Sequence, residues 1–155
     1  MNIAITNEHR WLQQLTGRWQ VTFDMQDHPL WQEDVRLLDG LWSIAELSGP
    51  MPDGNSATMI MTLGYDPALH RFVGSTIGTM MSNLWVYDGG LDETGTILTL
   101  DCEGPDMTDA GRTARYRDII TIIDADTRRF SSRMENADGS WNPVMASHYK
   151  RMAAT

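Results

Sequence analysis

The chain has 155 residues, 41% apolar and 21% charged, and its 12 Lys and Arg against 21 Asp and Glu give a formal net charge of −9. This length and balance predict one folded domain over residues 1–155 and exclude a disordered chain. The acidic charge argues against nucleic acids and anionic membranes as partners, and no run is apolar for long enough to cross a membrane. One cysteine, Cys102, excludes an internal disulfide, and we expect a cytoplasmic protein.

The first predicted element is a short helix over residues 7–15. Trp11, Leu12 and Leu15 recur at helical spacing, and Asn7 can cap the amide groups of the first turn. Gly17 is expected to end the helix, because glycine readily takes the left-handed backbone conformation that closes a helix.

The remainder, residues 17–151, predicts about ten antiparallel strands. Short alternating runs rich in Val, Ile, Thr and aromatic residues are separated by turn-forming residues such as Asp39-Gly40 and Asp88-Gly89-Gly90. The expected strands are 18–25, 31–38, 42–47, 57–65, 71–79, 83–88, 96–103, 113–123, 129–136 and 141–151. An open sheet of this size would leave unpaired edges, so we expect an all-β, up-and-down antiparallel barrel with the helix covering one mouth.

Two resemblances make this fold more specific. Gly17 and Trp19 at the start of the first strand, with Arg151 at the end of the last, resemble the lipocalin signature in which a basic side chain covers a tryptophan at the barrel base. The chain from His9 to Arg151 also resembles the bacterial DUF1579 family of lipocalin-like barrels. The matching stretches include His9-Arg10-Trp11-Leu12, Thr62-Leu63-Gly64-Tyr65-Asp66-Pro67, Arg71-Phe72-Val73-Gly74, Leu84-Trp85-Val86-Tyr87, Glu103-Gly104-Pro105, Tyr116-Arg117-Asp118 and His148-Tyr149.

The family resemblance implies a lipocalin-like barrel and no assigned function. The chain is more loosely similar to the haem-binding nitrobindin barrels. Because unrelated functions share such barrels, candidate sites have to be argued from individual residues.

A first set of candidates is apolar or aromatic and would suit a small hydrophobic ligand. Methionine is flexible and polarisable, so it can line an adaptable pocket, although it can equally fill a core. The candidates are Met59, Met61, Trp85, Tyr87, Met134 and Met145. In the expected strands 57–65 and 83–88 both faces carry apolar residues, which predicts a surface buried in a homodimer.

A second set is charged or titratable. Arg115 and Arg117 share one strand face: facing inward they would bind an acidic group of an anionic or amphipathic ligand, and facing outward they would pair with acidic residues of the preceding strand. His148, beside Tyr149, is a candidate haem ligand or general base, or else a structural histidine. The histidine spacings predict no metal site, and no cofactor is predicted apart from the haem alternative.

Three functions remain open at this point. The leading hypothesis is a non-enzymatic barrel that binds a small hydrophobic or amphipathic molecule in its interior. The alternatives are a cavity enzyme or haem-binding barrel that uses His148 and Tyr149, and a filled barrel with a structural or interaction role. The absence of a complete catalytic set in the sequence disfavours the enzyme.

Overall fold

The structure, a computed structural model, describes residues 3–153. Within them the chain forms α1 (Asn7–Gln13), β1 (Gly17–Phe23), β2 (Trp31–Leu38), β3 (Trp42–Pro50), β4 (Ser56–Asp66), β5 (Arg71–Gly78), β6 (Trp85–Leu91), β7 (Ile97–Pro105), β8 (Thr113–Asp124), β9 (Thr127–Glu135) and β10 (Trp141–Arg151). No helix in this part of the chain has the length and apolar character that a membrane crossing requires.

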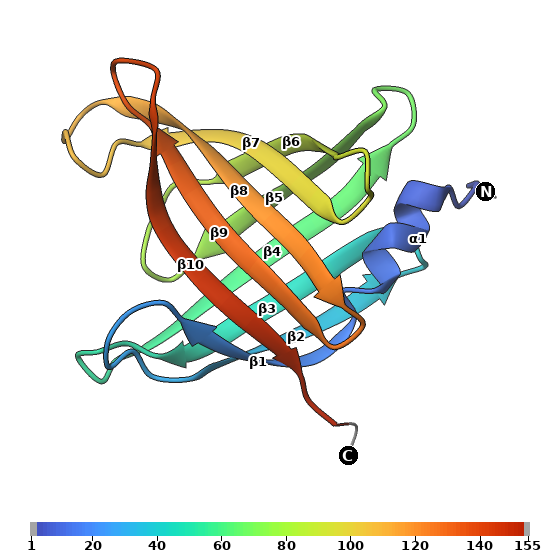
Figure 1. Cartoon of the computed structure of the whole chain (residues 1–155), viewed down its shortest axis with the longest axis horizontal. Helices are drawn as coiled ribbons and strands as arrows, with labels where there is room; N and C mark the ends of the chain where they lie inside the picture. The colour runs from blue at the N-terminus through green and yellow to red at the C-terminus, as the bar shows by residue number, and fades with distance from the viewer. Residues whose placement is uncertain (1–2, 154–155) are drawn as a thin grey trace.

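The strands form a closed antiparallel barrel (Figure 1). Each strand pairs with the strands that precede and follow it in the chain, and β1 pairs with β10 to close the barrel, with Trp19 opposite Arg151. The prediction of an all-β, up-and-down barrel with a short N-terminal helix is therefore confirmed. We call the end that α1 covers the closed end, and the opposite end, which carries the loops 24–30, 51–55, 79–84, 106–112 and 136–140, the open end.

The N-cap of α1 lies one residue earlier than the predicted cap, Asn7. Thr6 is the N-cap, and its hydroxyl accepts a hydrogen bond from the His9 amide while the His9 ring accepts one from the Thr6 amide. The predicted cap Asn7 is therefore wrong. The helix ends at Gln13 instead of reaching Leu15, and its C-terminal cap is Gln14.

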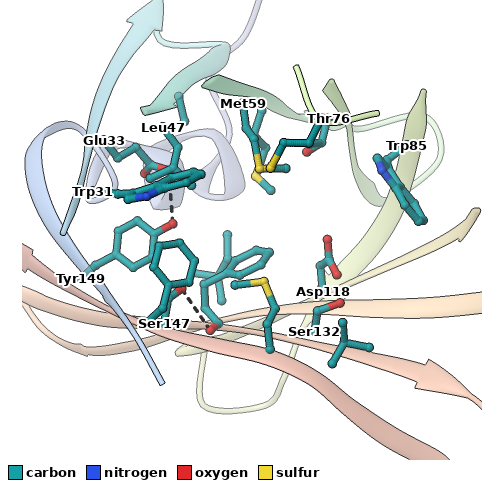
Figure 2. A pocket seen from close by; sticks show the side chains of 18 of the residues that line it. Trp31, Glu33, Leu47, Met59, Thr76, Trp85, Asp118, Ser132, Ser147 and Tyr149 are labelled. Carbon is teal, nitrogen blue, oxygen red and sulfur yellow. Dashed lines mark hydrogen bonds between the residues drawn. The ribbon is translucent and has the colours of Figure 1, made fainter. Parts of the chain in front are cut away.

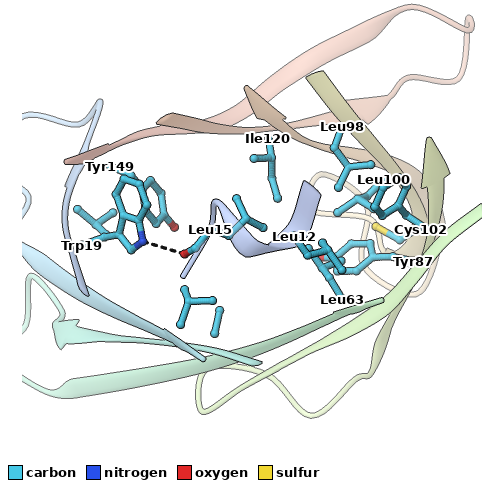
Figure 3. Packing of buried hydrophobic residues seen from close by; sticks show 14 of the residues in the cluster. Leu12, Leu15, Trp19, Leu63, Tyr87, Leu98, Leu100, Cys102, Ile120 and Tyr149 are labelled. Carbon is cyan, nitrogen blue, oxygen red and sulfur yellow. Dashed lines mark hydrogen bonds between the residues drawn. The ribbon is translucent and has the colours of Figure 1, made fainter. Parts of the chain in front are cut away.

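Leucines from α1 and the segment after it fill the closed end of the barrel. Leu12 and Leu15 are fully or almost fully buried, and they lie among Leu63, Leu98 and Ile120 (Figure 3). Burial of each leucine side chain contributes roughly 1.5–3 kcal/mol to folding. The helix is therefore fixed to the barrel by apolar packing.

Trp19 lies at the base of the barrel, as the lipocalin signature implies. The Arg151 guanidinium lies 4.3 Å from the Trp19 ring centroid, and the Trp19 indole donates a hydrogen bond to the Leu15 carbonyl. Gly17 does not close the helix: it is the first residue of β1, has a φ of +113°, and leaves room for Arg151, whose Nη1 would lie 2.7 Å from a Cβ at that position. The glycine is needed here for a close approach.

The run Asp88-Gly89-Gly90, predicted as a turn, lies inside β6. A Cβ at Gly89 would lie 1.9 Å from the carbonyl oxygen of Thr99 on β7, so this glycine lets two strands approach closely. The turn follows at Asp92, whose carboxylate accepts hydrogen bonds from the amides of Thr96 and Ile97.

Candidate ligand-binding cavity

The barrel encloses a cavity of about 390 Å³ toward its open end (Figure 2). Its lining is mainly apolar and comes from strands around the whole barrel. The predicted candidates that line it are Met59, Met61, Trp85, Tyr87, Met145 and Tyr149. The interior is therefore hollow, contrary to the filled-barrel alternative.

Methionines surround the mouth of the cavity. Met25, Met80 and Met107 are exposed, and together with Met51 and Met81 they line the open end. Flexible, polarisable thioethers can adapt to ligands of different shape. Three methionines of this group, Met25, Met51 and Met107, were not anticipated from the sequence.

Two tryptophans lie flat against neighbouring strands inside the cavity. Trp31 packs on Gly49 and Trp85 on Gly104, where a Cβ would lie 2.2 Å and 2.1 Å from the respective rings. The Trp85 ring also makes an edge contact with Tyr116 at a centroid distance of 5.0 Å. These glycines let the rings lie against the wall and leave space in the centre.

A buried ion pair forms the floor of the cavity. Arg128 donates a hydrogen bond of 2.5 Å to Glu33, and its guanidinium lies 4.1 Å from the Tyr149 ring centroid and 4.5 Å from that of Trp19. Tyr149 donates a longer hydrogen bond, 3.4 Å, to the same carboxylate. Burial, and then the charge of Glu33, raise the pKa of Tyr149, so its hydroxyl stays protonated.

A second polar cluster lies on the wall, closer to the open end. Tyr87 donates a hydrogen bond of 2.6 Å to Asp118, and Ser132 is the register partner of Asp118 on β9. Burial raises the pKa of Asp118, and the hydrogen bonds from Tyr87 and Ser132 oppose that shift. The Thr76 hydroxyl, also on the wall, has no hydrogen-bond partner among the described residues.

Arg115 and Arg117 lie on the outer face of β8, so their assignment to the cavity is corrected. Arg117 pairs with Asp101 at 3.2 Å and stacks on Trp141, while Arg115 approaches Glu135 at 3.5 Å. Successive side chains of β8 point alternately inward and outward. Because Tyr116 and Asp118 face the interior, Arg115 and Arg117 point outward. Arg115 and Arg117 therefore do not favour an anionic ligand inside the barrel.

His148 is on the outer face of β10, where its Nε2 lies 3.3 Å from Asp24. The prediction that His148 binds haem or acts as a general base in the cavity is corrected. The flanking residues Ser147 and Tyr149 face the interior, so strand alternation directs His148 outward. Met134 is buried but lies outside the cavity lining. Among residues 3–153, no three His, Cys, Asp or Glu side chains gather as a metal site.

Three charged residues of the interior were not identified as site residues from the sequence: Glu33, Asp118 and Arg128. A signal for one of them was present, because Glu33 stands between Trp31 and Val35 on the apolar face of β2. An acidic residue in such a stripe indicates a buried partner. That partner, Arg128, is 95 residues away along the chain and was not identifiable by spacing.

Comparison with known proteins gives a family and a fold. The model of the family described as "Protein of unknown function (DUF1579)" matches residues 4–151. No curated protein matches. Among solved structures, the chain is similar to the S-type phycobiliprotein lyase CPES from Guillardia theta, with a TM-score of 0.53 and 13% identity over 99% of this chain and 100% of that one.

Two other barrels are similar at lower scores. A redesigned β-barrel has a TM-score of 0.48 and 13% identity over 97% of this chain and 100% of that one. The protein EF1p2_mFAP2b bound to DFHBI has a TM-score of 0.46 and 14% identity over 94% and 99%.

Proposed function

We propose that this protein, which belongs to the DUF1579 family of proteins of unknown function, binds a small hydrophobic or amphipathic molecule inside its barrel. The observation that carries the proposal is the cavity of about 390 Å³, lined mainly by apolar side chains. Cavities that bind small molecules have volumes of roughly 300–1,000 Å³, with an apolar lining and a few placed polar groups.

The arrangement of the cavity supports a binding role in two further ways. Apolar side chains that border an unfilled space lose contacts with neighbouring atoms, so a ligand that restores those contacts stabilises the folded protein. The exposed methionines Met25, Met80 and Met107 lie where a ligand would enter. A ligand can therefore reach the cavity from the open end.

We propose binding in preference to catalysis because the reactive side chains on these strands either face outward or are already hydrogen-bonded within the protein. Arg117 and His148 face outward. Tyr149 is hydrogen-bonded to Glu33, and Tyr116 donates a hydrogen bond of 2.5 Å to the carbonyl of Pro105. A haem bound in the cavity would have no ligand from His148.

The experiment is to fill the cavity and measure ligand binding. Ala45 on β3 lines the cavity, and the Ala45→Phe variant adds a phenyl ring to that space. The matched control is Ser48→Phe on the exposed face of the same strand. We expect an apolar fluorescent dye to quench or shift tryptophan emission in the wild type and in Ser48→Phe, and its affinity to fall at least about tenfold in Ala45→Phe.

Native mass spectrometry of protein purified from cells provides the second measurement. A small molecule retained by the wild type and lost in Ala45→Phe would support the proposal. Equal dye affinity in the wild type and both variants would contradict it, because binding would then occur elsewhere on the surface.

Two further proposals concern location and assembly. We propose a cytoplasmic protein that forms a homodimer through the outer face of β5 and β6, where Ile77 and Val86 are 50% and 61% exposed. Exposed apolar side chains on adjacent strands are typical of association surfaces. Light scattering during size-exclusion chromatography should give the mass of a dimer, and Val86→Asp should shift it to that of a monomer.

A further inference from the structure

We propose that the cavity selects ligands that carry a cationic amine, and that Asp118 binds this amine beside the aromatic rings of Trp85 and Tyr116. The inference rests on the proposed function, because it names the class of ligand for the same cavity. It follows from the charges, the geometry and the aromatic surroundings of the cavity wall.

The charges inside the barrel do not balance. Among residues 3–153, the cavity lining contains the carboxylates of Glu33 and Asp118, the guanidinium of Arg128 and the imidazole of His28. The His28 ring packs against Phe23 and Trp31 and is hydrogen-bonded to the Pro29 carbonyl, so it does not pair with Asp118. Arg128 and Glu33 neutralise each other at 2.5 Å. The lining thus supplies no cation for Asp118, and a buried carboxylate without a cation is unfavourable.

The carboxylate of Asp118 is oriented for an incoming partner. It points into the cavity from β8, with Ser132 beside it and Trp85 across the open space (Figure 2). The hydroxyl of Tyr87 donates a hydrogen bond of 2.6 Å to it. A carboxylate can accept about four hydrogen bonds, so capacity remains for an ammonium group.

Two aromatic rings border the same space as this carboxylate, Tyr116 on the same strand face and Trp85 across the opening. Tyr116 precedes Asp118 by two residues and therefore shares its strand face, and the ring of Trp85 contacts that of Tyr116 at a centroid distance of 5.0 Å. A cation is attracted to the faces of such rings. The combination of one carboxylate with two aromatic rings suits an organic cation.

Two more side chains near Asp118 are uncharged. The buried hydroxyl of Thr76 has no partner among the described residues and can accept a hydrogen bond. The thiol of Cys102 is held protonated, because burial and then the charge of Asp118 raise its pKa to about 12. A neutral hydroxyl and a neutral thiol do not balance the charge of Asp118.

The test compares three probes that share one aromatic body: 1-naphthylmethylamine, 1-naphthylmethanol and 1-naphthoate. Their affinities for the full chain are measured by calorimetry at neutral pH. We expect the amine to bind at least about tenfold more tightly than the alcohol, which is the range of a hydrogen bond to a charged group, and the acid to bind most weakly.

Two variants assign this preference to one carboxylate. Asp118→Asn keeps the shape of the side chain and should remove the advantage of the amine while the alcohol retains its affinity. Asp101→Asn changes the net charge equally but alters an outward carboxylate that pairs with Arg117, and it should keep the advantage. Circular dichroism establishes that each variant is folded.

Each outcome decides the inference. Equal affinity of the wild type for the amine and the alcohol would overturn it, and so would an amine advantage that persists in a folded Asp118→Asn. If that variant does not fold, the ranking of the three probes on the wild type decides. Binding of the alcohol without preference for the amine refutes this inference alone, whereas binding of none of the probes also refutes the proposed function.

Discussion

The two ends of the barrel differ in how their interior is filled. At the closed end, Leu12, Leu15 and Trp19 are buried, and the pair of Arg128 and Glu33 lies against them. At the open end the same strands enclose a cavity, and the loops carry methionines. Tight packing and the cavity proposed to bind a ligand are therefore separated along the barrel axis, so that substitutions at one end should affect stability and those at the other should affect binding.

β10 shows this division within a single strand. Its Tyr149 packs against Arg128 on the floor, whereas Met145, two inward positions earlier, borders the cavity at the strand irregularity between Pro143 and Met145. Alternation directs both side chains inward, and their position along the strand determines what each contacts. Substitutions at each end can test this comparison. The largest loss of stability is expected at the Arg128–Glu33 pair on the floor of the cavity.

Glu33→Gln should produce the largest loss of stability. It leaves the guanidinium of Arg128 buried between Trp19 and Tyr149 without its counter-charge, and breaking a buried pair in this way costs about 3–5 kcal/mol. Urea unfolding measures the change. The control is the adjacent Asp34→Asn, whose exposed pair with Arg18 should contribute about 1 kcal/mol or less. Equal losses in both variants would show that the floor does not depend on this pair.

Truncation of one apolar side chain at each end compares their packing directly. Leu12→Ala removes a side chain that is 0% exposed and should reduce the free energy of unfolding by about 3 kcal/mol. Met61→Ala should cost only about 1 kcal/mol, because Met61 already borders the cavity and loses fewer contacts. Thermal or urea unfolding of both variants gives the difference. If Met61→Ala is as destabilising as Leu12→Ala, the cavity wall is as tightly packed as the closed end.

Asp118→Asn should change how stability depends on pH. Burial raises the pKa of Asp118 above the ordinary value of 3.8, so the folded protein holds that proton more tightly than the unfolded chain. The resulting stabilisation of the wild type is complete below pH 3.8 and is lost as pH rises through the raised pKa. Relative to the wild type, Asp118→Asn should therefore become more stable as pH rises from acidic to neutral. A constant difference between the two proteins across this range would contradict the raised pKa.

The strands were predictable from the sequence because alternation and turn residues are local signals. Alternation defines two faces but does not determine which one is inside, and this is why Arg117 was open to either assignment until the inward Asp118 fixed it. The capping of α1 by Thr6 and His9 was missed because Asn7 is an equally good cap by residue type. The contact of Glu33 with Arg128 depends on barrel closure, which brings β2 and β9 together across the interior and which no local pattern encodes.

The smallest effect is expected on the outer face, which belongs to neither end of the interior. The side chains of His148 and Asp24 are 44% and 55% exposed and 3.3 Å apart, and an exposed pair of this kind contributes about 1 kcal/mol or less. His148→Ala should therefore leave urea unfolding nearly unchanged. It should also leave probe affinity unchanged, whereas Ala45→Phe on the inner face should reduce that affinity. A strong loss of probe binding in His148→Ala would mean that the outer face of β10 contributes to the site, and the assignment of ligand binding to the open end alone would then be wrong.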